Sequence, residues 1–180
     1  MGLRRSLKIT NLVVNGDFRN GTTGWTFGAS VTDKTIVNGA LTWTLPGFIG
    51  YTEDNWVSQN IIPSAGKYYI RLKAKRNNSV SNNQLLIGRS FWDLNVFDLS
   101  TEFRTYSKIW NCTGSGSLVF GASEITNGLN VNIDDVFLIN LTDIFGVGNE
   151  PMQAQCDIWF ANWFDGTLAE RIMGRKGGLH

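Results

Sequence analysis

The clearest alternation of hydrophobic and polar residues runs from Lys67 to Arg76. Its apolar phase consists of Tyr68, Ile70, Leu72 and Ala74. Tyr69, Arg71, Lys73 and Lys75 fill the other phase. A period of two residues places the phases on opposite faces of an extended chain. The segment is therefore predicted to be a strand with one face in a core and one facing outward.

Similar short extended segments recur along most of the chain. We predict strands at 7–14, 25–37 (broken near Gly28), 40–45, 56–62, 84–92, 103–112, 117–122 and 129–141. Turn residues such as Pro46-Gly47 and Pro63 separate several of them. About nine strands at intervals of about ten residues are typical of an all-β sandwich.

The last of these strands carries one charged residue in its apolar phase. The expected inward face reads Leu129, Val131, Ile133, Asp135, Phe137, Ile139 and Leu141. A carboxylate that faces a core must be paired, hydrogen-bonded or bound to a metal. Asp135 is therefore the sharpest chemical signal in the sequence.

The pattern changes near Gly146. Pro151 stands where a helix often begins, and apolar residues then recur at helical spacing as Met152, Cys156, Trp159, Phe160 and Trp163. We predict an amphipathic helix over 150–164 that is docked on the sandwich. The predicted organisation is a sandwich over residues 1–145, followed by a helix and a basic tail over 146–180.

Composition supports one all-β domain and excludes several classes of partner. The chain has 180 residues, with 20 Gly, 11 Phe and 7 Trp, which suits one domain rich in turns and strands. The formal net charge of +1 predicts no nucleic-acid partner. No apolar run reaches the length of a membrane span, and residues 1–10 lack the apolar core of a signal peptide, so no membrane partner is expected.

The few residues with catalytic or metal-binding chemistry argue against an enzyme. His180, the single histidine, stands at the end of the sequence, so neither a Ser-His-Asp nor a Cys-His set can be built. The two cysteines, Cys112 and Cys156, form no zinc set and are expected to be free thiols. Acidic residues are present, but no pair stands out as a glycosidase pair.

Four short motifs over about residues 11–141 carry a family resemblance. They are Asn15-Gly16-Asp17-Phe18, Gly24-Trp25, Val57-Ser58-Gln59-Asn60-Ile61 and Asp134-Asp135-Val136-Phe137-Leu138. In this order and spacing they resemble the jelly-roll carbohydrate-binding modules of the 4/9 type. The resemblance implies a jelly-roll β-sandwich that binds a glycan and is not an enzyme.

A second resemblance concerns biological role. Residues 138–151 (LINLTDIFGVGNEP), followed by 163–167 (WFDGT), resemble a segment that follows such modules in phages of Gram-positive bacteria. There it occurs in tail and baseplate proteins. The resemblance implies a tail, baseplate or fibre protein of a virion assembled in the host cytoplasm. Its partners would be host cell-surface carbohydrate, other virion proteins and further copies of itself. Two alternatives stay open: a module of a polysaccharide- or cell-wall-degrading enzyme, and an assembly protein without sugar binding.

The resembled modules hold a structural calcium ion near the position of Asp135, together with the Glu that follows their Gly-Asp-Phe motif. The resemblance makes Asp135 and Asp17 candidate calcium ligands, but Arg19 stands at the position of that Glu. A cation there replaces an anionic oxygen ligand. One interpretation is that Arg19 pairs with Asp135 in place of the ion; the other is that backbone amides hold Asp135. No other cofactor is expected.

Aromatic residues on the polar phase of strands are candidates for a sugar-binding face, since sugars stack on aromatic rings through their C–H groups. Trp25 and Trp43 are expected in the core. Trp56, Tyr69 and Trp92 are predicted to be exposed on neighbouring strands of one sheet, with Arg71 and Gln84 as hydrogen-bonding groups. The alternative is that these residues cover a sheet edge or a subunit interface.

Overall fold

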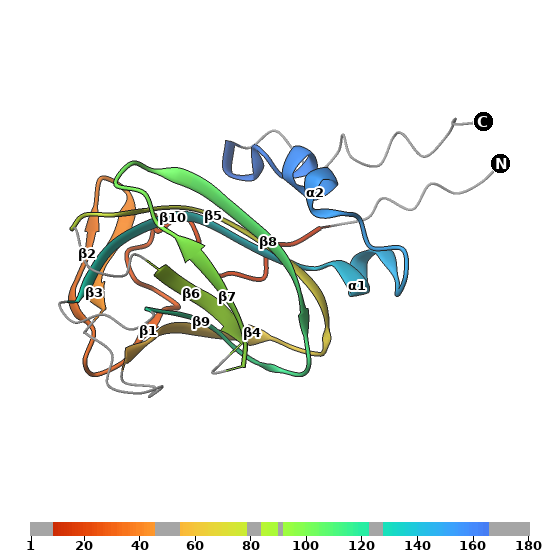
Figure 1. Cartoon of the computed structure of the whole chain (residues 1–180), viewed down its shortest axis with the longest axis horizontal. Helices are drawn as coiled ribbons and strands as arrows, with labels where there is room; N and C mark the ends of the chain where they lie inside the picture. The colour runs from red at the N-terminus through yellow and green to blue at the C-terminus, as the bar shows by residue number, and fades with distance from the viewer. Residues whose placement is uncertain (1–8, 46–54, 79–83, 90–91, 123–127, 166–180) are drawn as a thin grey trace.

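Two five-stranded antiparallel sheets pack face to face in the computed structural model, which describes residues 9–45, 55–78, 84–89, 92–122 and 128–165 (Figure 1). Sheet I contains, in spatial order, β1 (Thr26–Phe27), β4 (Val57–Ile62), β9 (Gly116–Ala122), β6 (Gln84–Arg89) and β7 (Trp92–Asp98). Sheet II contains β2 (Thr32–Val37), β3 (Ala40–Leu45), β10 (Leu129–Asn140), β5 (Gly66–Arg76) and β8 (Arg104–Cys112). The predicted all-β sandwich is confirmed.

The central core lies between the sheets and uses the apolar phase of each strand. Trp43, Ile70, Leu85, Phe120 and Val131 are fully buried in it. Trp25 lies in the same cluster, with its ring centroid 5.5 Å from that of Phe120. The predictions that Trp25 and Trp43 are core residues are confirmed.

Two predicted strands differ from the structure. Residues 84–92 form no single strand, because β6 ends at Arg89 and the antiparallel β7 begins at Trp92, with Gln84 opposite Asp98. Residues 9–14 are not a strand, and residues 7 and 8 lie outside the described residues. The segment nevertheless bonds to β10, since the Leu12 backbone N–H donates to the Leu138 carbonyl at 2.8 Å.

A β-bulge in β10 overturns the predicted inward face of that strand. Asp134 lies opposite Lys73 and Phe137 lies opposite Arg71, so Asp135 and Val136 together oppose one residue of β5. The extra residue, Asp135, has a φ of 51°. One added residue reverses the alternation. Val136 and Leu138 therefore point into the central core, whereas Phe137 and Ile139 point out of it.

The N-terminal motif holds this bulge. The Asn11 side chain donates to the Val136 carbonyl at 3.0 Å and accepts from the Leu138 N–H at 2.9 Å. The Gly16 carbonyl accepts from the Val136 N–H at 2.9 Å. Two of the four motifs that suggested the family, Asn15–Phe18 and Asp134–Leu138, therefore meet in space through Gly16. Together with Asn11, Gly16 satisfies backbone groups that the bulge removes from the ladder.

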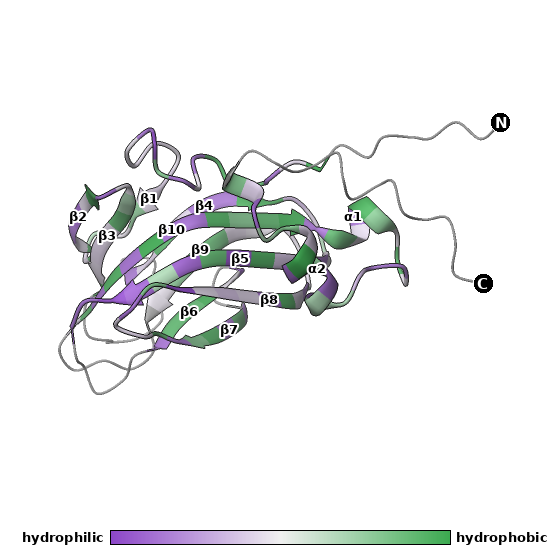
Figure 2. Cartoon of the chain, turned by 90° about the horizontal axis from the view of Figure 1, so that it is seen from above, coloured by the Kyte–Doolittle hydropathy of each residue, from purple (hydrophilic) through white to green (hydrophobic). Residues whose placement is uncertain are grey.

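Two short helices follow β10, and one of them covers half of the outer face of sheet II. They are α1 (Leu141–Phe145) and α2 (Gln153–Trp159), followed by the 3-10 turn η2 (Trp163–Asp165). A second apolar cluster forms beneath α2, which we call the helix-side cluster: Ile9, Tyr69, Phe137, Ile139, Leu141, Cys156 and Phe160. Figure 2 shows α2 over one end of β5 and β8, with the other end of the sheet uncovered.

The predicted helix over 150–164 is shorter than expected, and α1 falls where the last strand was predicted to end. The docking of the helix on the sandwich is confirmed: Cys156 and Phe160 are fully buried, and Trp159 and Trp163 pack against the same cluster. Cys112 and Cys156 are free thiols, as predicted, and both are buried. The basic tail lies outside the described residues. No helix in the described part of the chain is long and apolar enough to cross a bilayer.

Candidate functional site

The five residues predicted to bind sugar do not share one face. Gln84 and Trp92 belong to sheet I and Trp56 directly precedes its strand β4, whereas Tyr69 and Arg71 lie on β5 of sheet II. The predicted exposed group of Trp56, Tyr69 and Trp92 on one sheet is therefore wrong. Gln84 and Trp92 lie towards opposite ends of sheet I, since Gln84 pairs with Asp98 and Trp92 pairs with Arg89.

Tyr69 is fully buried rather than exposed. Its ring lies in the helix-side cluster, and its hydroxyl donates to Asp157 Oδ1 of α2 at 2.8 Å. Burial, with the neighbouring Asp157 carboxylate, raises the pKa of Tyr69 far above its usual range. The alternation identified the outward phase of β5 correctly but could not show that a later helix covers it. Arg71, opposite Phe137, is half-buried on the same face.

The outer face of sheet I carries a separate row of apolar residues across four strands. Gly121 lies opposite Leu86, Leu86 lies opposite Val96, and Trp56 stands over Gly121. Trp56 and Leu86 are each 5% exposed, yet neither belongs to the central or the helix-side cluster. Val96, at the end of the row, is 48% exposed. Apolar side chains therefore line the side of sheet I that faces away from the central core.

Gly121 allows the Trp56 indole to lie against the sheet. A Cβ at position 121 would come within 2.9 Å of two ring carbons of Trp56. The missing side chain leaves room for the ring to rest on β9, an arrangement that glycine in a strand often permits. The prediction that Trp56 is exposed is wrong: the residue directly precedes β4, and its ring is buried against a glycine on a strand far away in the sequence.

Polar groups border this apolar row. Ser58 lies opposite Val119 in the next row, and Asn60 is exposed beyond it on β4. At the opposite border, Gln84 Nε2 donates to Asp98 Oδ1 at 3.1 Å. We name the surface made by Trp56, Leu86, Val96, Val119, Ser58 and Asn60 the sheet I face. It combines an apolar floor with hydroxyl and amide groups, which is the chemistry that recognises a sugar.

The candidate calcium ligands each have a cationic partner. Asp135 Oδ2 lies 2.6 Å from Lys73 Nζ, and Asp17 Oδ2 lies 3.1 Å from Arg19 Nε. The predicted pairing of Arg19 with Asp135 is therefore wrong, because Asp135 pairs with Lys73 of the neighbouring strand β5 and Arg19 pairs with Asp17. No group of three or more candidate ligands occurs among the described residues. Cations therefore stand beside both of the carboxylates that the resemblance made candidate calcium ligands.

The neighbouring Asp134 was not singled out by the sequence, although it stands in a recognised motif. Burial raises its pKa from 3.8 to about 6, and the charges of Asp135 and Asp17 act in the same direction. The backbone N–H of Asp135 and the Lys73 ammonium oppose the rise. Asp134 is thus a carboxyl group that releases its proton close to neutral pH.

Asp134→Asn should stabilise the protein at about pH 8 by about 1 kcal/mol, after allowance for solvent screening, and should give no gain near pH 4. The folded state holds the Asp134 proton more tightly than the unfolded chain does, so stability is lost as pH rises towards 6. The amide keeps an oxygen that can accept from the Asp135 N–H, as Asp134 Oδ1 does. Urea unfolding of the variant and the unmutated protein at both pH values measures this difference in stability. An equal gain at both would show that ionisation of Asp134 is not the cause.

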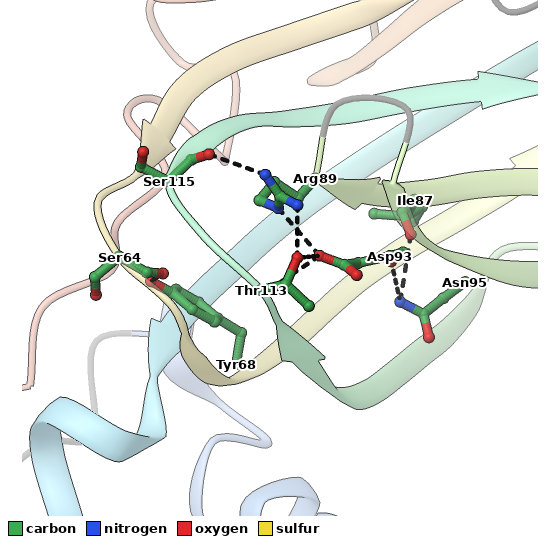
Figure 3. Close-up of polar contacts among 8 residues, drawn as sticks. All are labelled: Ser64, Tyr68, Ile87, Arg89, Asp93, Asn95, Thr113 and Ser115. Atoms are coloured by element: carbon green, nitrogen blue, oxygen red, sulfur yellow. Dashed lines mark hydrogen bonds and ion pairs between the residues drawn. The ribbon is translucent and has the colours of Figure 1, made fainter.

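A second polar cluster lies where β6, β7 and the β8–β9 connection meet (Figure 3). Arg89 donates to Asp93 Oδ2 at 3.0 Å, to Thr113 Oγ1 at 2.7 Å and to the Ser115 carbonyl at 3.1 Å. Although burial opposes it, hydrogen bonds from Thr113 and Arg89 lower the pKa of Asp93. Every member is engaged with another, so the cluster joins the connection between the two sheets to the edge of sheet I.

Comparisons with known proteins identify the architecture. No family model matches the sequence, and no curated protein is significantly similar to it. Among solved structures, a family 4 carbohydrate-binding module matches 68% of this chain and 99% of its own, with 19% identity and a TM-score of 0.50. A family 16 module matches 72% of this chain and 100% of its own, with 15% identity and a TM-score of 0.51.

The CBM22-1 xylan-binding domain from Paenibacillus barcinonensis Xyn10C matches 73% of this chain and 95% of its own, with 12% identity and a TM-score of 0.50. The chain has the fold of a carbohydrate-binding module. These neighbours come from several module families, and the predicted jelly-roll sandwich is confirmed by them. Within this fold, α2 and the helix-side cluster cover one end of the outer face of sheet II.

Proposed function

We propose that the protein is a non-enzymatic glycan-binding domain and that the sheet I face is its binding surface. The observation that supports this most is the apolar row of Trp56, Leu86 and Val96, which belongs to neither hydrophobic cluster and is bordered by polar groups. The fold is that of structures known as carbohydrate-binding modules.

The chemistry of the face suits a sugar chain. The C–H groups of a pyranose pack on apolar and aromatic surface, and its hydroxyls require hydrogen-bonding groups beside that surface. Val96 and Asn60 are exposed at two sides of the face, and Trp56 supplies a ring between them that is 5% exposed. We infer that a ligand contacts mainly the exposed rim of the face.

The finer role we propose is that of a virion component, in a phage tail, baseplate or fibre, that attaches to host cell-surface carbohydrate. It rests on the resemblance of residues 138–151 and 163–167 to phage segments. The expected partners are other virion proteins and further copies of the chain, which would strengthen weak single-site binding. Light scattering of the isolated chain tests self-association.

A second candidate is an assembly protein that has this fold without sugar binding. One observation favours it: three apolar residues are strongly exposed on and beside α2, namely Val147 at 84%, Met152 at 72% and Ile158 at 76%. Exposed apolar residues that cluster are typical of interaction surfaces. A folded sample that binds no glycan on an array would favour this candidate over the first.

Val96→Glu should weaken glycan binding by at least about tenfold, since a charge then enters the apolar row where the ligand packs. The matched control is Val14→Glu, because Val14 is similarly exposed, at 55%, but lies in the N-terminal segment. A glycan array followed by calorimetry with the best glycan measures both variants. Equal affinities for the two variants would exclude the sheet I face as the binding surface.

A further inference from the structure

Phe103 stands out on the other side of the molecule. Among the described side chains, it is the only aromatic one in the exposed class, with 45% of its surface accessible. It lies just before β8, whose first residue, Arg104, is opposite Ala74 of β5. Figure 2 shows that α2 leaves one end of this sheet uncovered. The Lys75 ammonium stands 5.2 Å from its ring centroid. An exposed phenyl ring with hydrogen-bonding neighbours is a common element of sugar sites.

Two hollows meet at this ring. The larger has a volume of about 340 Å³ and is lined by Lys73, Phe103, Arg104, Thr105 and Asp134. The smaller has a volume of about 190 Å³ and is lined by Val37, Asn38, Thr42, Lys75, Asn77, Phe103 and Asn132. Phe103 lines both hollows, and we call the two together the Phe103 groove.

The floor of the groove is held rigidly by amide side chains. Asn77 donates to Asn132 Oδ1, and Asn132 donates to Thr42 Oγ1 on β3. Asn132 is 6% exposed, so its position is fixed by packing as well as by these bonds. A preformed set of polar groups lowers the entropic cost of binding.

Hydrogen-bonding capacity remains at the groove surface. Among the described residues, neither Asn77 Oδ1 nor Asp134 Oδ2 has a recorded hydrogen-bond donor, and Lys75 Nζ has no recorded acceptor. The groove therefore offers two acceptors and one charged donor around a phenyl ring. Each could serve a hydroxyl group of a ligand.

The charges on the floor balance. Lys73 lies opposite Asp134 and is paired with Asp135, whereas Lys75 lies opposite the neutral Asn132. Arg104 adds one cation at the rim. Without a strong excess of either sign on its floor, the groove favours a neutral, polyhydroxylated ligand over an ionic one.

We propose that the Phe103 groove is a second saccharide-binding site, for a neutral sugar of an oligosaccharide chain, on the sheet opposite to the sheet I face. Phe103 is its stacking platform, and Asn77, Lys75 and Asp134 bond the hydroxyls. Two sites on opposite sheets would let one molecule hold two glycan chains. The site stands independently of the sheet I face.

The test is an NMR titration of the full chain with xylohexaose and cellohexaose as neutral probes and trigalacturonate as an anionic one. We expect a neutral probe to shift the backbone amides of Lys75, Asn77, Phe103 and Thr105 in a saturable way. Phe103→Ala should weaken this response at least about tenfold, whereas Phe103→Trp, which keeps a ring, should retain it. Val14→Glu serves as the control for general surface change.

The same spectra separate this proposal from the sheet I face, whose reporters are Ser58, Asn60 and Val119. A response of the groove without these amides supports the groove and counts against the sheet I face. A response confined to the sheet I face overturns the groove. The groove proposal is also overturned by shifts that trigalacturonate alone causes, by an undiminished response in Phe103→Ala, or by the absence of a response to any probe.

Discussion

Phe160→Ala should lower the free energy of unfolding by about 4 kcal/mol. Phe160 is fully buried, and its ring centroid lies 5.1 Å from that of Phe137, 5.7 Å from that of Tyr69 and 6.1 Å from that of Trp163. Removing the ring opens a cavity where strands β5 and β10 meet the C-terminal segment. Urea unfolding followed by tryptophan fluorescence measures the loss, since Trp163 reports from the same cluster.

Ile158→Ala is the matched control, because Ile158 lies two residues earlier and is 76% exposed. Its effect should stay within about 0.5 kcal/mol. If Phe160→Ala unfolds at the same urea concentration as the unmutated protein, the C-terminal segment does not dock on sheet II in solution. The outer ends of β5 and β10 would then present Tyr69 and Phe137 to solvent.

Gly16→Ala should cost about 3 kcal/mol, at the upper end of the usual range for overpacking. A Cβ at position 16 would lie 2.2 Å from the Val136 carbonyl oxygen, which is part of the backbone and cannot rotate away. The N-terminal segment would have to leave the bulge and give up the hydrogen bond from Val136 N–H to the Gly16 carbonyl. Thermal unfolding by circular dichroism measures the loss.

Gly21→Ala provides the control within the same loop. Gly21 has a φ of 63°, and a Cβ there would meet nothing within 4 Å. Its cost is therefore only the conformational one, about 1 kcal/mol. Equal losses for the two variants would show that contact with the Val136 carbonyl oxygen does not add to the cost at position 16.

The sandwich could be predicted because alternation reports directly which phase of a strand is buried. Lys67 to Arg76 is the plainest case, since every residue of its apolar phase lies in the central core. The bulge could not be predicted in this way. Asp134 and Asp135 are both polar, so the pattern does not show which of them is the extra residue. Because the alternation reverses after Asp135, the sequence pattern predicted the wrong layer for Phe137 and Ile139.

The candidate sites were harder to predict for a related reason. Alternation distinguishes two faces of a strand but not what covers the outer one. Tyr69 and Trp56 have the same outward phase, yet α2 covers Tyr69, and Trp56 lies against Gly121 of a distant strand. Phe103 was predicted to begin a strand over 103–112, but β8 begins at Arg104, so the strand pattern does not show how this ring is exposed. A signal was available at Asp134, since it stands beside Asp135, the carboxylate that the alternation predicted to face the core.

The reactivity of the two buried thiols can report partial unfolding of the protein. Cys156 is fully buried in the helix-side cluster, and burial raises its pKa to about 12. Cys112 is 4% exposed in the central core, where burial also raises its pKa. An alkylating reagent can therefore attack Cys156 only after α2 lifts away, and Cys112 only after the sheets separate. The ratio of the two labelling rates reports how often the C-terminal segment detaches while the sandwich remains closed.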